Sequence, residues 1–336
     1  MLLVGDVGGT KTILALCDRQ DEGWVRVREQ RFASGAHPSL ESVIRAFLAP
    51  VEVQVEAACF GVAGPVFEGR SRITNLSWMI DEATLSIGLG GAKVCLLNDL
   101  QAMAMGLLAL GPEDWYDFNP SARKQAGNQA VIAAGTGLGE AILFWDGERH
   151  HPIATEGGHA SFAPSDEFED ALIQSLRRQG YRHVSVERLL SGSGIWLLYQ
   201  HLRSLGSWPE SEALAEALRG AGDPAPVISR FALQGQDVLA METLRRFARI
   251  YGAEAGNLAL RSLAVGGLLL GGGIAPQILP ALIEDDRFMS GFLAKEPFGP
   301  MLREIPVRVA LNPATALLGA IQHGARHLLG EASTRR

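Results

Sequence analysis

The sequence predicts an α/β protein built from two similar domains. The first thirty residues read as strand, glycine-rich turn, strand, turn and strand, and residues 130–159 repeat that order around a second turn, GTGLG. The chain has 336 residues, which is enough for two domains. Two copies of one such unit indicate two similar domains facing each other, and a cleft between such domains is a usual place for a ligand.

The first glycine-rich stretch, GDVGGTKT (Gly5–Thr12), lies one residue short of a Walker A phosphate loop, because Thr10 stands where that loop needs its second glycine. A Walker A loop runs into a helix whose N-terminus helps to hold the phosphates. Here the chain continues as ILALCD, a short turn and WVRVREQRF, in which Val25 and Val27 alternate with arginines as in a half-buried strand. The glycines therefore belong to a hairpin, and alone they favour a structural turn at least as well as phosphate binding.

Between the two repeats the periodicity predicts alternating helices and strands. The segment PSLESVIRAFLAP has helical spacing, with an apolar face formed by Leu40, Val43, Ile44 and Phe47. The buried strand VEAACFGVAGPV, which ends in a Gly-Pro break, and the strand KVCLLND follow. Helices are predicted over 79–89 and over LQAMAMGLLAL, and the polar stretch 111–129 is predicted to be a connection. The second half is mostly helical, and it contains one apolar strand that ends in Gly271–Gly273 before a last apolar-faced helix.

Composition and charge limit the classes of function. No apolar run reaches the ~18 residues needed to span a membrane, and the N-terminus has no signal-peptide pattern, so we expect a cytoplasmic protein without a membrane partner. The formal charge of −7 argues against broad affinity for nucleic acid, although it leaves room for a local cationic nucleotide pocket. Cys17, Cys59 and Cys95 lie in apolar stretches with no CxxC pair, and they read as reduced core residues.

Six motifs in a fixed order carry a family resemblance: GDVGGT, LLNDL, GTGLG, EGGH, SVERLLSGSG and LLLGGGIAP. In this order they resemble the bacterial glucokinases of the hexokinase–actin ATPase superfamily, from the first strand to the last helix. The resemblance implies an α/β fold of two RNase-H-like (actin/hexokinase-type) domains with a central interdomain cleft for ATP, Mg²⁺ and a hexose. It also implies that the C-terminal helix returns to the first domain. We therefore expect a small domain of residues 1–110 plus 312–330, a large domain of residues 111–311, and a homodimer.

Two positions depart from the pattern of that family. Lys11 stands where many close glucokinases have Asn, although related sugar kinases carry Lys there, and Ser193 stands where Pro is frequent. The Cys-rich zinc motif of the wider repressor–kinase family is absent from the sequence, as is a helix-turn-helix module before GDVGGT. The first departure leaves the kinase function intact but loosens the assignment to a subfamily.

The chemistry of phosphoryl transfer to a sugar hydroxyl needs a group that orients and deprotonates the attacking oxygen. Asp99 is the candidate general base, since a carboxylate within hydrogen-bond reach of the hydroxyl can accept its proton, and Asn98 beside it can hold a neighbouring hydroxyl. The alternative role for Asp99 is the N-cap of the helix that follows. The resemblance favours catalysis, and the two roles are compatible.

Sugar binding calls for carboxylate acceptors and an imidazole, because sugar hydroxyls both donate and accept. The matched positions are Glu156 and His159, separated by two glycines, and Glu187 in SVERLLSG. The pattern alone would make Glu187 a solvated carboxylate in the first turn of a helix. Asn75, in TNLSW, matches a sugar-side loop of the family. A zinc site in HHPIATEGGH is possible by residue type, but its spacing matches no zinc motif.

ATP binding is implied for the two hairpin turns, whose backbone N–H groups can hold phosphates, and for the third glycine cluster, which would pass close to adenosine. These residues are Gly5, Asp6, Gly8, Gly9, Thr10, Lys11, Gly135, Thr136, Gly137, Gly271, Gly272 and Gly273. Asp6 is the expected indirect ligand of Mg²⁺, which neutralises the charge that develops on the phosphates. For the third cluster, a strand-to-helix turn and a dinucleotide fold are the alternatives.

The function expected from these residues is ATP-dependent phosphorylation of glucose to glucose 6-phosphate, with Asp99 as the general base. A kinase for another hexose or an N-acyl hexosamine is the first alternative. A non-catalytic sugar-sensing regulator is the second, and the presence of Asp99, Asp6 and both hairpins speaks against it. The sequence does not distinguish ATP from another phosphoryl donor such as polyphosphate.

Overall fold

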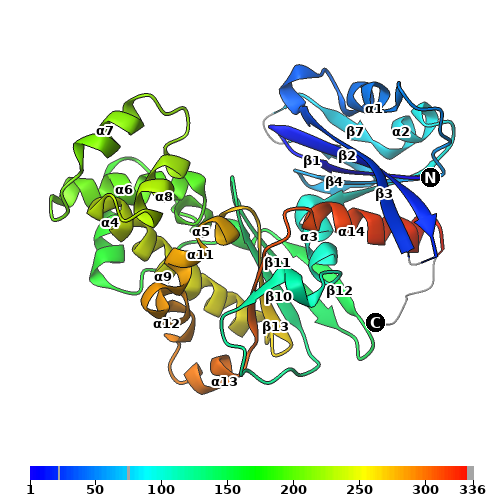
Figure 1. Cartoon of the computed structure of the whole chain (residues 1–336). Helices are drawn as coiled ribbons and strands as arrows, with labels where there is room; N and C mark the ends of the chain where they lie inside the picture. Colours follow the sequence, from blue (N-terminus) through cyan, green and yellow to red (C-terminus); the bar gives the residue numbers. More distant parts are fainter. Residues whose placement is uncertain (22, 74–75, 331–336) are drawn as a thin grey trace. The chain divides into compact units, whose positions relative to one another are not determined.

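The chain divides into two compact units in the computed structural model, which describes residues 1–21, 23–73 and 76–330. Unit 1 comprises Met1–Asp114 together with the C-terminal segment from Asn312, and unit 2 comprises Trp115–Leu311. Each unit has its own sheet and its own hydrophobic core. Each is therefore described by itself, with its elements labelled as in Figure 1.

Unit 1 is built on a five-stranded sheet with the order β3-β2-β1-β4-β8. Strands β1, β2 and β3 are antiparallel, whereas β1, β4 and β8 are parallel. The bounds are β1 Leu2–Val7, β2 Lys11–Gln20, β3 Gly23–Ala33, β4 Ala57–Val62 and β8 Lys93–Asn98. A second, three-stranded sheet consists of β5 Val66–Phe67, β6 Arg70–Arg72 and β7 Met79–Asp81.

Helices cover both faces of this sheet. On one face α1 (Leu40–Leu48) buries the four residues of its predicted apolar face against the strands. On the other face α3 (Asp99–Leu107) and α14 (Thr315–His323) lie side by side under β1 and β4 (Figure 1), and α14 runs into a π-helical turn, η5 (Gly324–Leu328). The short helix α2 (Glu82–Gly88) follows β7. The return of the C-terminal helix to the first strands, which the sequence resemblance implies, is thus present within unit 1.

The contact between α3 and α14 is made by backbone approaching backbone. A Cβ placed on Gly319 would lie 1.7 Å from the Ala102 carbonyl oxygen, and one on Gly106 would lie 1.8 Å from that of Thr315. Such distances leave no room for a methyl group, and overpacking a core of this density forces the helices apart. The two glycines therefore fix the depth at which α14 packs on the helix that begins with Asp99.

We expect Gly319→Ala to lower the free energy of unfolding of unit 1 by about 2 kcal/mol, within the range that overpacking costs. The measurement is denaturant unfolding followed by a tryptophan or circular dichroism signal. Gly88→Ala is the matched control, since it is also a helical glycine but has no atom within 4 Å of its added Cβ. Equal stabilities of Gly319→Ala and Gly88→Ala would contradict the close packing of α3 and α14.

Unit 2 repeats the strand order of unit 1. Its sheet has the order β12-β11-β10-β13-β14-β9, in which β10, β11 and β12 form an antiparallel meander and β10, β13 and β14 are parallel. The bounds are β9 Trp115–Asp117, β10 Gln129–Ala134, β11 Leu138–Trp145, β12 His150–Thr155, β13 Gly267–Gly271 and β14 Val307–Ala310. The repeat of strand, glycine-rich turn, strand, turn and strand that the sequence predicts is confirmed.

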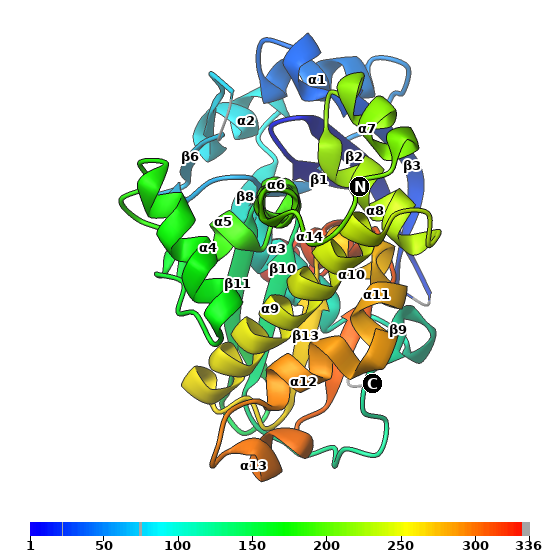
Figure 2. The same cartoon turned by 90° about the vertical axis from the view of Figure 1, so that its left-hand side faces the viewer.

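Helices make up most of unit 2. The long helix α9 (Val238–Ser262) crosses one face of the sheet with α12 beside it (Figure 2). The others are α4 Glu167–Arg178, α5 Val186–Leu189, α6 Gly192–Leu205, α7 Glu212–Arg219, α8 Pro224–Leu233, α10 Ile274–Gln277, α11 Leu279–Ile283, α12 Arg287–Leu293 and α13 Gly299–Arg303. None of the helices among the described residues combines the length and the apolar composition that crossing a membrane demands.

Two of the expected elements are wrong in part. The helix predicted over 79–89 begins only at Glu82, because Asp81 caps it and Met79–Asp81 pairs with β6 as a strand. The predicted connection 111–129 contains β9, which pairs with β14, a strand far away in the sequence. In both cases the strand exists because of a partner that local periodicity does not reveal.

Candidate active site

The predicted catalytic and phosphate-binding residues of unit 1 lie at one edge of its sheet. Strands β1, β4 and β8 are parallel, with Asp6 opposite Gly61 and Val62 opposite Asn98. Their carboxyl ends therefore meet at the same edge, which is where ligands bind in open α/β sheets. The structure brings together the turn after β1, the loop after β4 and the start of α3.

The first hairpin turn consists of Gly8, Gly9 and Thr10, between β1 and β2. Gly8 donates its N–H to the Lys11 carbonyl at 2.9 Å. Ser34, which follows β3, supports the turn from below: its hydroxyl donates to the Gly8 carbonyl at 2.7 Å, and its N–H donates to the Thr10 carbonyl at 3.1 Å. The turn is thus held in one shape by a buried residue that sequence reasoning missed.

Close packing inside the sheet explains why residue 5 is glycine. It lies inside β1, where an added Cβ would come within 2.7 Å of the Phe60 ring and 2.8 Å of the Leu14 side chain. The sheet itself therefore requires glycine at this position. A role for Gly5 in holding a nucleotide stays a prediction.

Asp6 and Lys11 give the first hairpin its charge. Burial raises the pKa of the Asp6 carboxyl above its usual value, and the nearby Lys11 ammonium partly offsets that rise. A cation bound beside Asp6 would favour its ionised form further. A role for Asp6 in holding a metal ion stays a prediction.

Asn98, and not Asp99, caps helix α3. The Asn98 side-chain oxygen accepts from the Leu100 N–H at 3.0 Å, and the Gln101 side-chain oxygen accepts from the Asn98 N–H at 3.3 Å, which completes a capping box. Asn98 also donates its amide to the Gly64 carbonyl at 3.2 Å. The alternative that Asp99 is the N-cap is therefore wrong. Much of the hydrogen-bonding capacity of Asn98 serves the helix and the loop after β4.

Asp99 is the first residue of α3, and it is exposed. One of its carboxylate oxygens accepts from the Leu100 N–H at 2.8 Å, which fixes the side chain at the positive end of the helix. Its carboxylate is thus exposed and held at a defined position at the start of α3.

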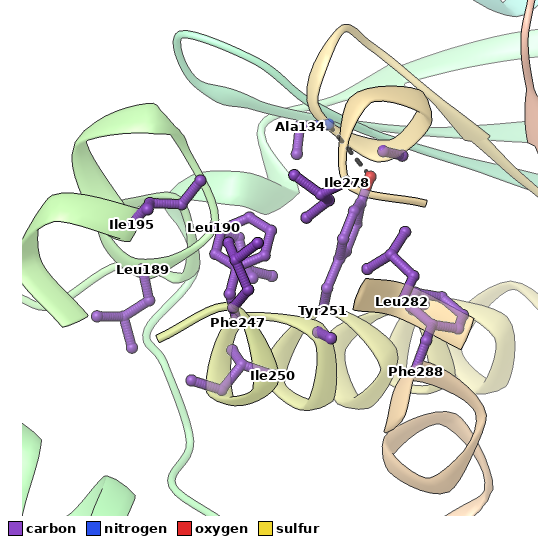
Figure 3. Close-up of a cluster of buried hydrophobic side chains, with 14 of the residues drawn as sticks. Ala134, Leu189, Leu190, Ile195, Phe247, Ile250, Tyr251, Ile278, Leu282 and Phe288 are labelled. Atoms are coloured by element: carbon purple, nitrogen blue, oxygen red, sulfur yellow. Dashed lines mark hydrogen bonds between the residues drawn. The ribbon is translucent and has the colours of Figure 1, made fainter. Parts of the chain in front are cut away.

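The second hairpin turn is Gly135–Gly137, between β10 and β11. Gly135 donates to the Gly137 carbonyl at 2.8 Å and accepts from the N–H of Gly192, the first residue of α6, at 3.0 Å. The preceding Ala134 donates its N–H to the hydroxyl of the buried Tyr251 at 3.3 Å (Figure 3). The long helix α9, through Tyr251, thus contacts the residue that precedes this turn.

The third glycine cluster lies next to the second hairpin. Strand β13 is parallel to β10, with Gly271 opposite Ala133, so both strands end at the same edge. Gly272 has a φ of +79°, and an added Cβ would lie 2.4 Å from the Ala134 carbonyl oxygen. Only glycine fits this conformation at this distance. The structure therefore brings the two predicted nucleotide segments of unit 2 together.

The three predicted sugar-binding residues of unit 2 also lie together. His159 Nδ1 is 3.7 Å from a Glu187 carboxylate oxygen, and His159 Nε2 is 3.9 Å from one of Glu156. The exposed fractions of the side chains are 61% for His159, 78% for Glu156 and 32% for Glu187, so all three can reach a ligand. We call these three residues the acceptor cluster.

Glu187 connects the acceptor cluster to the second hairpin. Its second carboxylate oxygen accepts from the Leu138 N–H at 3.0 Å, and an added Cβ on Gly137 would lie 2.4 Å from that oxygen. Position along the chain gave no sign of this contact, because Glu187 is 49 residues away from Leu138. The contact makes Glu187 a shared support of the acceptor cluster and the hairpin.

The two glycines of EGGH are required by close packing. The short 3-10 turn Gly157–His159 presses on the start of β11, so that an added Cβ on Gly158 would lie 2.1 Å from the Leu138 carbonyl oxygen, and one on Gly157 would lie 2.2 Å from a Glu140 carboxylate oxygen. Glu140 is 1% exposed. A buried carboxyl group thus lies directly beneath the loop that carries Glu156 and His159.

We expect Glu140 to make the stability of the protein depend on pH. Burial and the neighbouring Glu254 raise the pKa of Glu140 to about 7, from an ordinary value of 4.5. The contribution of the protonated Glu140 carboxyl to the free energy of unfolding is complete below pH 4.5 and is lost as the pH rises through about 7. The free energy of unfolding should therefore fall by about 2 kcal/mol more between pH 5 and pH 8 in the parent than in Glu140→Gln.

Denaturant unfolding at the two pH values measures this difference. Glu148→Gln, which changes an exposed carboxylate in the turn after β11, is the control and should keep the pH dependence of the parent. If Glu140→Gln loses as much stability with rising pH as the parent does, the buried carboxyl is not the group that titrates.

Two of the remaining predicted residues, Thr136 and Gly273, are described by the structure, and Asn75 is not. Thr136 lies in the second turn, and Gly273 immediately precedes α10. Asn75 lies outside the described residues. Among the residues that are described, no three His, Cys, Asp or Glu side chains are placed to share a metal ion.

Comparisons with known proteins match almost the whole chain to glucokinases. A family model described as Glucokinase matches residues 3–327. A glucokinase of Trichormus variabilis is 39% identical over 340 residues, which cover 97% of this chain and 99% of that protein. The crystal structure of a glucokinase from an Antarctic psychrotroph is 29% identical with a TM-score of 0.81, and the match covers 98% of this chain and 99% of that one.

A more distant structure, a ROK family glucokinase from Streptomyces griseus in complex with glucose and AMPPNP, shares the fold. It is 22% identical, with a TM-score of 0.65 over 97% of this chain and 99% of that chain. Together with the family model and the sequence identity above, this confirms the resemblance that the six motifs carry. The chain belongs to the glucokinase family.

Proposed function

We propose that the protein transfers the γ-phosphoryl group of ATP to glucose and releases glucose 6-phosphate and ADP. The observation that carries this proposal is the match to glucokinases along almost the whole chain. One glucokinase is 39% identical over 97% of this chain. The nucleotide is supported by the Streptomyces griseus enzyme of the same fold, which was solved with glucose and AMPPNP.

Asp99 is the proposed general base. Its carboxylate stands exposed at the start of α3, and the helix does not depend on it, because Asn98 supplies the cap. It would accept the proton of the attacking sugar hydroxyl as the new oxygen–phosphorus bond forms. Asn98 keeps one amide hydrogen beyond its bond to Gly64, and we propose that it donates this hydrogen to a neighbouring hydroxyl.

The acceptor cluster is the proposed holder of the sugar. Glu156 and Glu187 offer four carboxylate oxygens, and His159 between them can donate or accept. A site built to pair with hydroxyl groups rejects an analogue that lacks one, because its own polar atoms are then left unpaired. This chemistry selects a polyhydroxylated ring and orients it for transfer. Asn75 remains a proposed contact on the sugar side.

The two hairpin turns and the Gly271–Gly273 segment are proposed to hold the nucleotide. Short turns of this kind present backbone N–H groups to an anion, and Lys11 adds a positive charge beside the first turn. In unit 2 the second hairpin and the third glycine cluster meet at one edge of the sheet. The phosphates would lie on the hairpins and the adenosine against the glycine cluster.

Mg²⁺ fits the first hairpin as an ion that the protein holds mostly through the nucleotide. Magnesium in kinase sites is usually bound by one or two carboxylates together with phosphates and water. Asp6 supplies one carboxylate beside the first turn, and no cluster of three ligands is present among the described residues. When bound, the ion neutralises charge on the phosphates; Asp6 would hold it through water.

The organisation of the protein follows from the same proposal. We propose that the two units are the two RNase-H-like domains of the superfamily, since both sheets share the order of an antiparallel meander followed by parallel strands. A cytoplasmic enzyme agrees with the three free cysteines. A homodimer is proposed from the resemblance alone.

A panel of sugars tests the function directly. With ATP and Mg²⁺ in a coupled assay for ADP, glucose should give a higher kcat/KM than mannose, galactose, fructose and N-acetylglucosamine. A higher value for an N-acyl hexosamine would replace glucose as the substrate. Binding of glucose without any ADP release would instead identify a sugar-sensing protein, and replacement of ATP by polyphosphate in the same assay tests the donor.

A further inference from the structure

Two cysteines of unit 1 face each other on neighbouring strands. Cys59 on β4 and Cys95 on β8 are register partners in a parallel ladder, and both are free thiols. Both belong to the side of the sheet that α14 covers, where an added Cβ on Gly324 would lie 3.1 Å from the Cys59 Cβ. Register partners lie about 4.8 Å apart, which is within the Cα separation that a disulfide bond can span.

The two thiols differ in access and in their neighbours. Cys59 is fully buried, whereas Cys95 is half-buried, because β8 is the edge strand of the sheet. His323, the last residue of α14, places its Nε2 3.5 Å from the Cys95 Sγ. The imidazole of His327, on the π-helical turn that follows, stacks on that of His323 with the ring centroids 4.3 Å apart.

An imidazole beside a thiol stabilises its thiolate, the form that reacts with electrophiles. We propose that Cys95 is an oxidation site at which peroxide forms a reversible disulfide bond with Cys59. The Cys95 thiolate attacks hydrogen peroxide, so that a sulfur–oxygen bond forms, the oxygen–oxygen bond breaks and hydroxide leaves. The Cys59 thiol then attacks the sulfenic sulfur, the sulfur–sulfur bond forms and water leaves. Two electrons pass from the two thiols to one peroxide.

The surroundings of the two thiols favour Cys95 as the attacking thiolate and Cys59 as its partner. The hydrogen bond from the Cys59 thiol lowers the pKa of Cys95 to about 5; burial opposes this shift, and His323 and His327 add to it. The same hydrogen bond, together with burial, raises the pKa of Cys59. The other groups that face the pair are His327 from η5 and Glu82 from α2, and Glu82 acts against the thiolate. Lys93, on β8 itself, donates to the Leu328 carbonyl.

A metal ion is not the ligand that this cluster fits. Two thiols and two imidazoles gather here, yet within the described part of the chain no three such side chains are placed to share an ion. The feature that distinguishes the site is the pairing of one activated thiol with one buried partner. This is the arrangement of an attacking and a resolving cysteine.

Peroxide treatment of the full chain tests the site without reference to the kinase activity. After exposure to one equivalent of hydrogen peroxide, the chain is unfolded in denaturant, free thiols are blocked with N-ethylmaleimide and the cysteines are mapped by mass spectrometry. We expect a Cys59–Cys95 cross-linked peptide that dithiothreitol removes, with Cys17 blocked as a free thiol. The rate of the first step, in which the Cys95 thiol is lost, should change less than about 2-fold between pH 6 and pH 8, because the proposal makes Cys95 the thiolate in this range. The second step uses the Cys59 thiol, and the appearance of the cross-link follows it separately.

Variants separate the roles of the three side chains. Cys59→Ser should accumulate the sulfenic acid at Cys95, Cys95→Ser should form no cross-link, and Cys17→Ser should behave as the parent. His323→Gln should slow the reaction at pH 6 by roughly 10-fold and restore it at pH 8, as the thiolate fraction recovers. Oxidation of Cys17 instead, absence of the cross-link in the parent, or an unchanged rate for His323→Gln at pH 6 would each overturn the proposal.

Discussion

Asp99→Asn should lower the turnover of glucose by roughly 10²–10⁴-fold, which is the usual contribution of a positioned general base. The substitution keeps the shape of the side chain and removes its ability to accept a proton. The fold should not change, because the capping box of α3 is formed by Asn98 and Gln101. Glucose binding should survive, since the acceptor cluster belongs to unit 2. Steady-state kinetics and a glucose titration of the same sample measure the two effects.

Glu212→Gln is the matched control for Asp99→Asn. Glu212 is also the first residue of a helix, it follows a Ser211 cap, and it is exposed. Its substitution changes a first-turn carboxylate without touching the proposed site and should leave turnover at the level of the parent. Turnover of Asp99→Asn within a few-fold of the parent would remove Asp99 from the role of base.

Glu187→Ala should lower kcat/KM for glucose by roughly 10²–10⁴-fold. Two interactions are lost at once, each worth about 1.5–3 kcal/mol because a charged group takes part: the contact with the sugar and the hydrogen bond from the Leu138 N–H. Because that hydrogen bond supports the second hairpin, the apparent KM for ATP should rise as well. Glu156→Ala, whose carboxylate faces only His159 among these residues, should weaken glucose binding with little change in ATP.

Isothermal titration of glucose and of a nonhydrolysable ATP analogue distinguishes the two carboxylates. Glu167→Ala is the control, because Glu167 is an exposed first-turn carboxylate of α4 outside the acceptor cluster. Glucose affinity equal to the parent in both Glu156→Ala and Glu187→Ala would show that the sugar is held elsewhere. Glu187→Ala with a normal ATP response would show that its contact with the hairpin has no role in nucleotide binding.

The local pattern of apolar and polar residues was sufficient to predict the main strands and helices of both units. The strand–turn–strand repeats and the apolar face of α1 follow from residue periodicity alone, and the structure contains them. Pattern failed where a distant partner decides the conformation. Strand β9 exists because β14 pairs with it from about 190 residues away, as in the Arg308–Asp117 contact. Met79–Asp81 likewise becomes a strand because β6 is beside it.

The candidate site shows the same division. Motif order placed Glu156, His159 and Glu187 in one group, and the structure brings them together. No local signal indicated that Glu187 reaches Leu138, that Ser34 supports the first turn or that Glu140 lies beneath Gly157. A serine after a strand and a glutamate within an apolar strand carry no signature of their partners. A buried charged residue in an apolar strand is nevertheless unusual, and Glu140 could have been marked for that reason.

Identification of the product tests the central claim most directly. The purified protein is incubated with glucose, ATP and Mg²⁺, and the products are quantified by enzymatic assay and by phosphorus NMR. The account predicts that glucose 6-phosphate and ADP appear in equal amounts, that neither forms without glucose, and that Asp99→Asn forms both at the reduced rate given above. Phosphate on another carbon of the sugar, or release of ADP that does not depend on glucose, would contradict it.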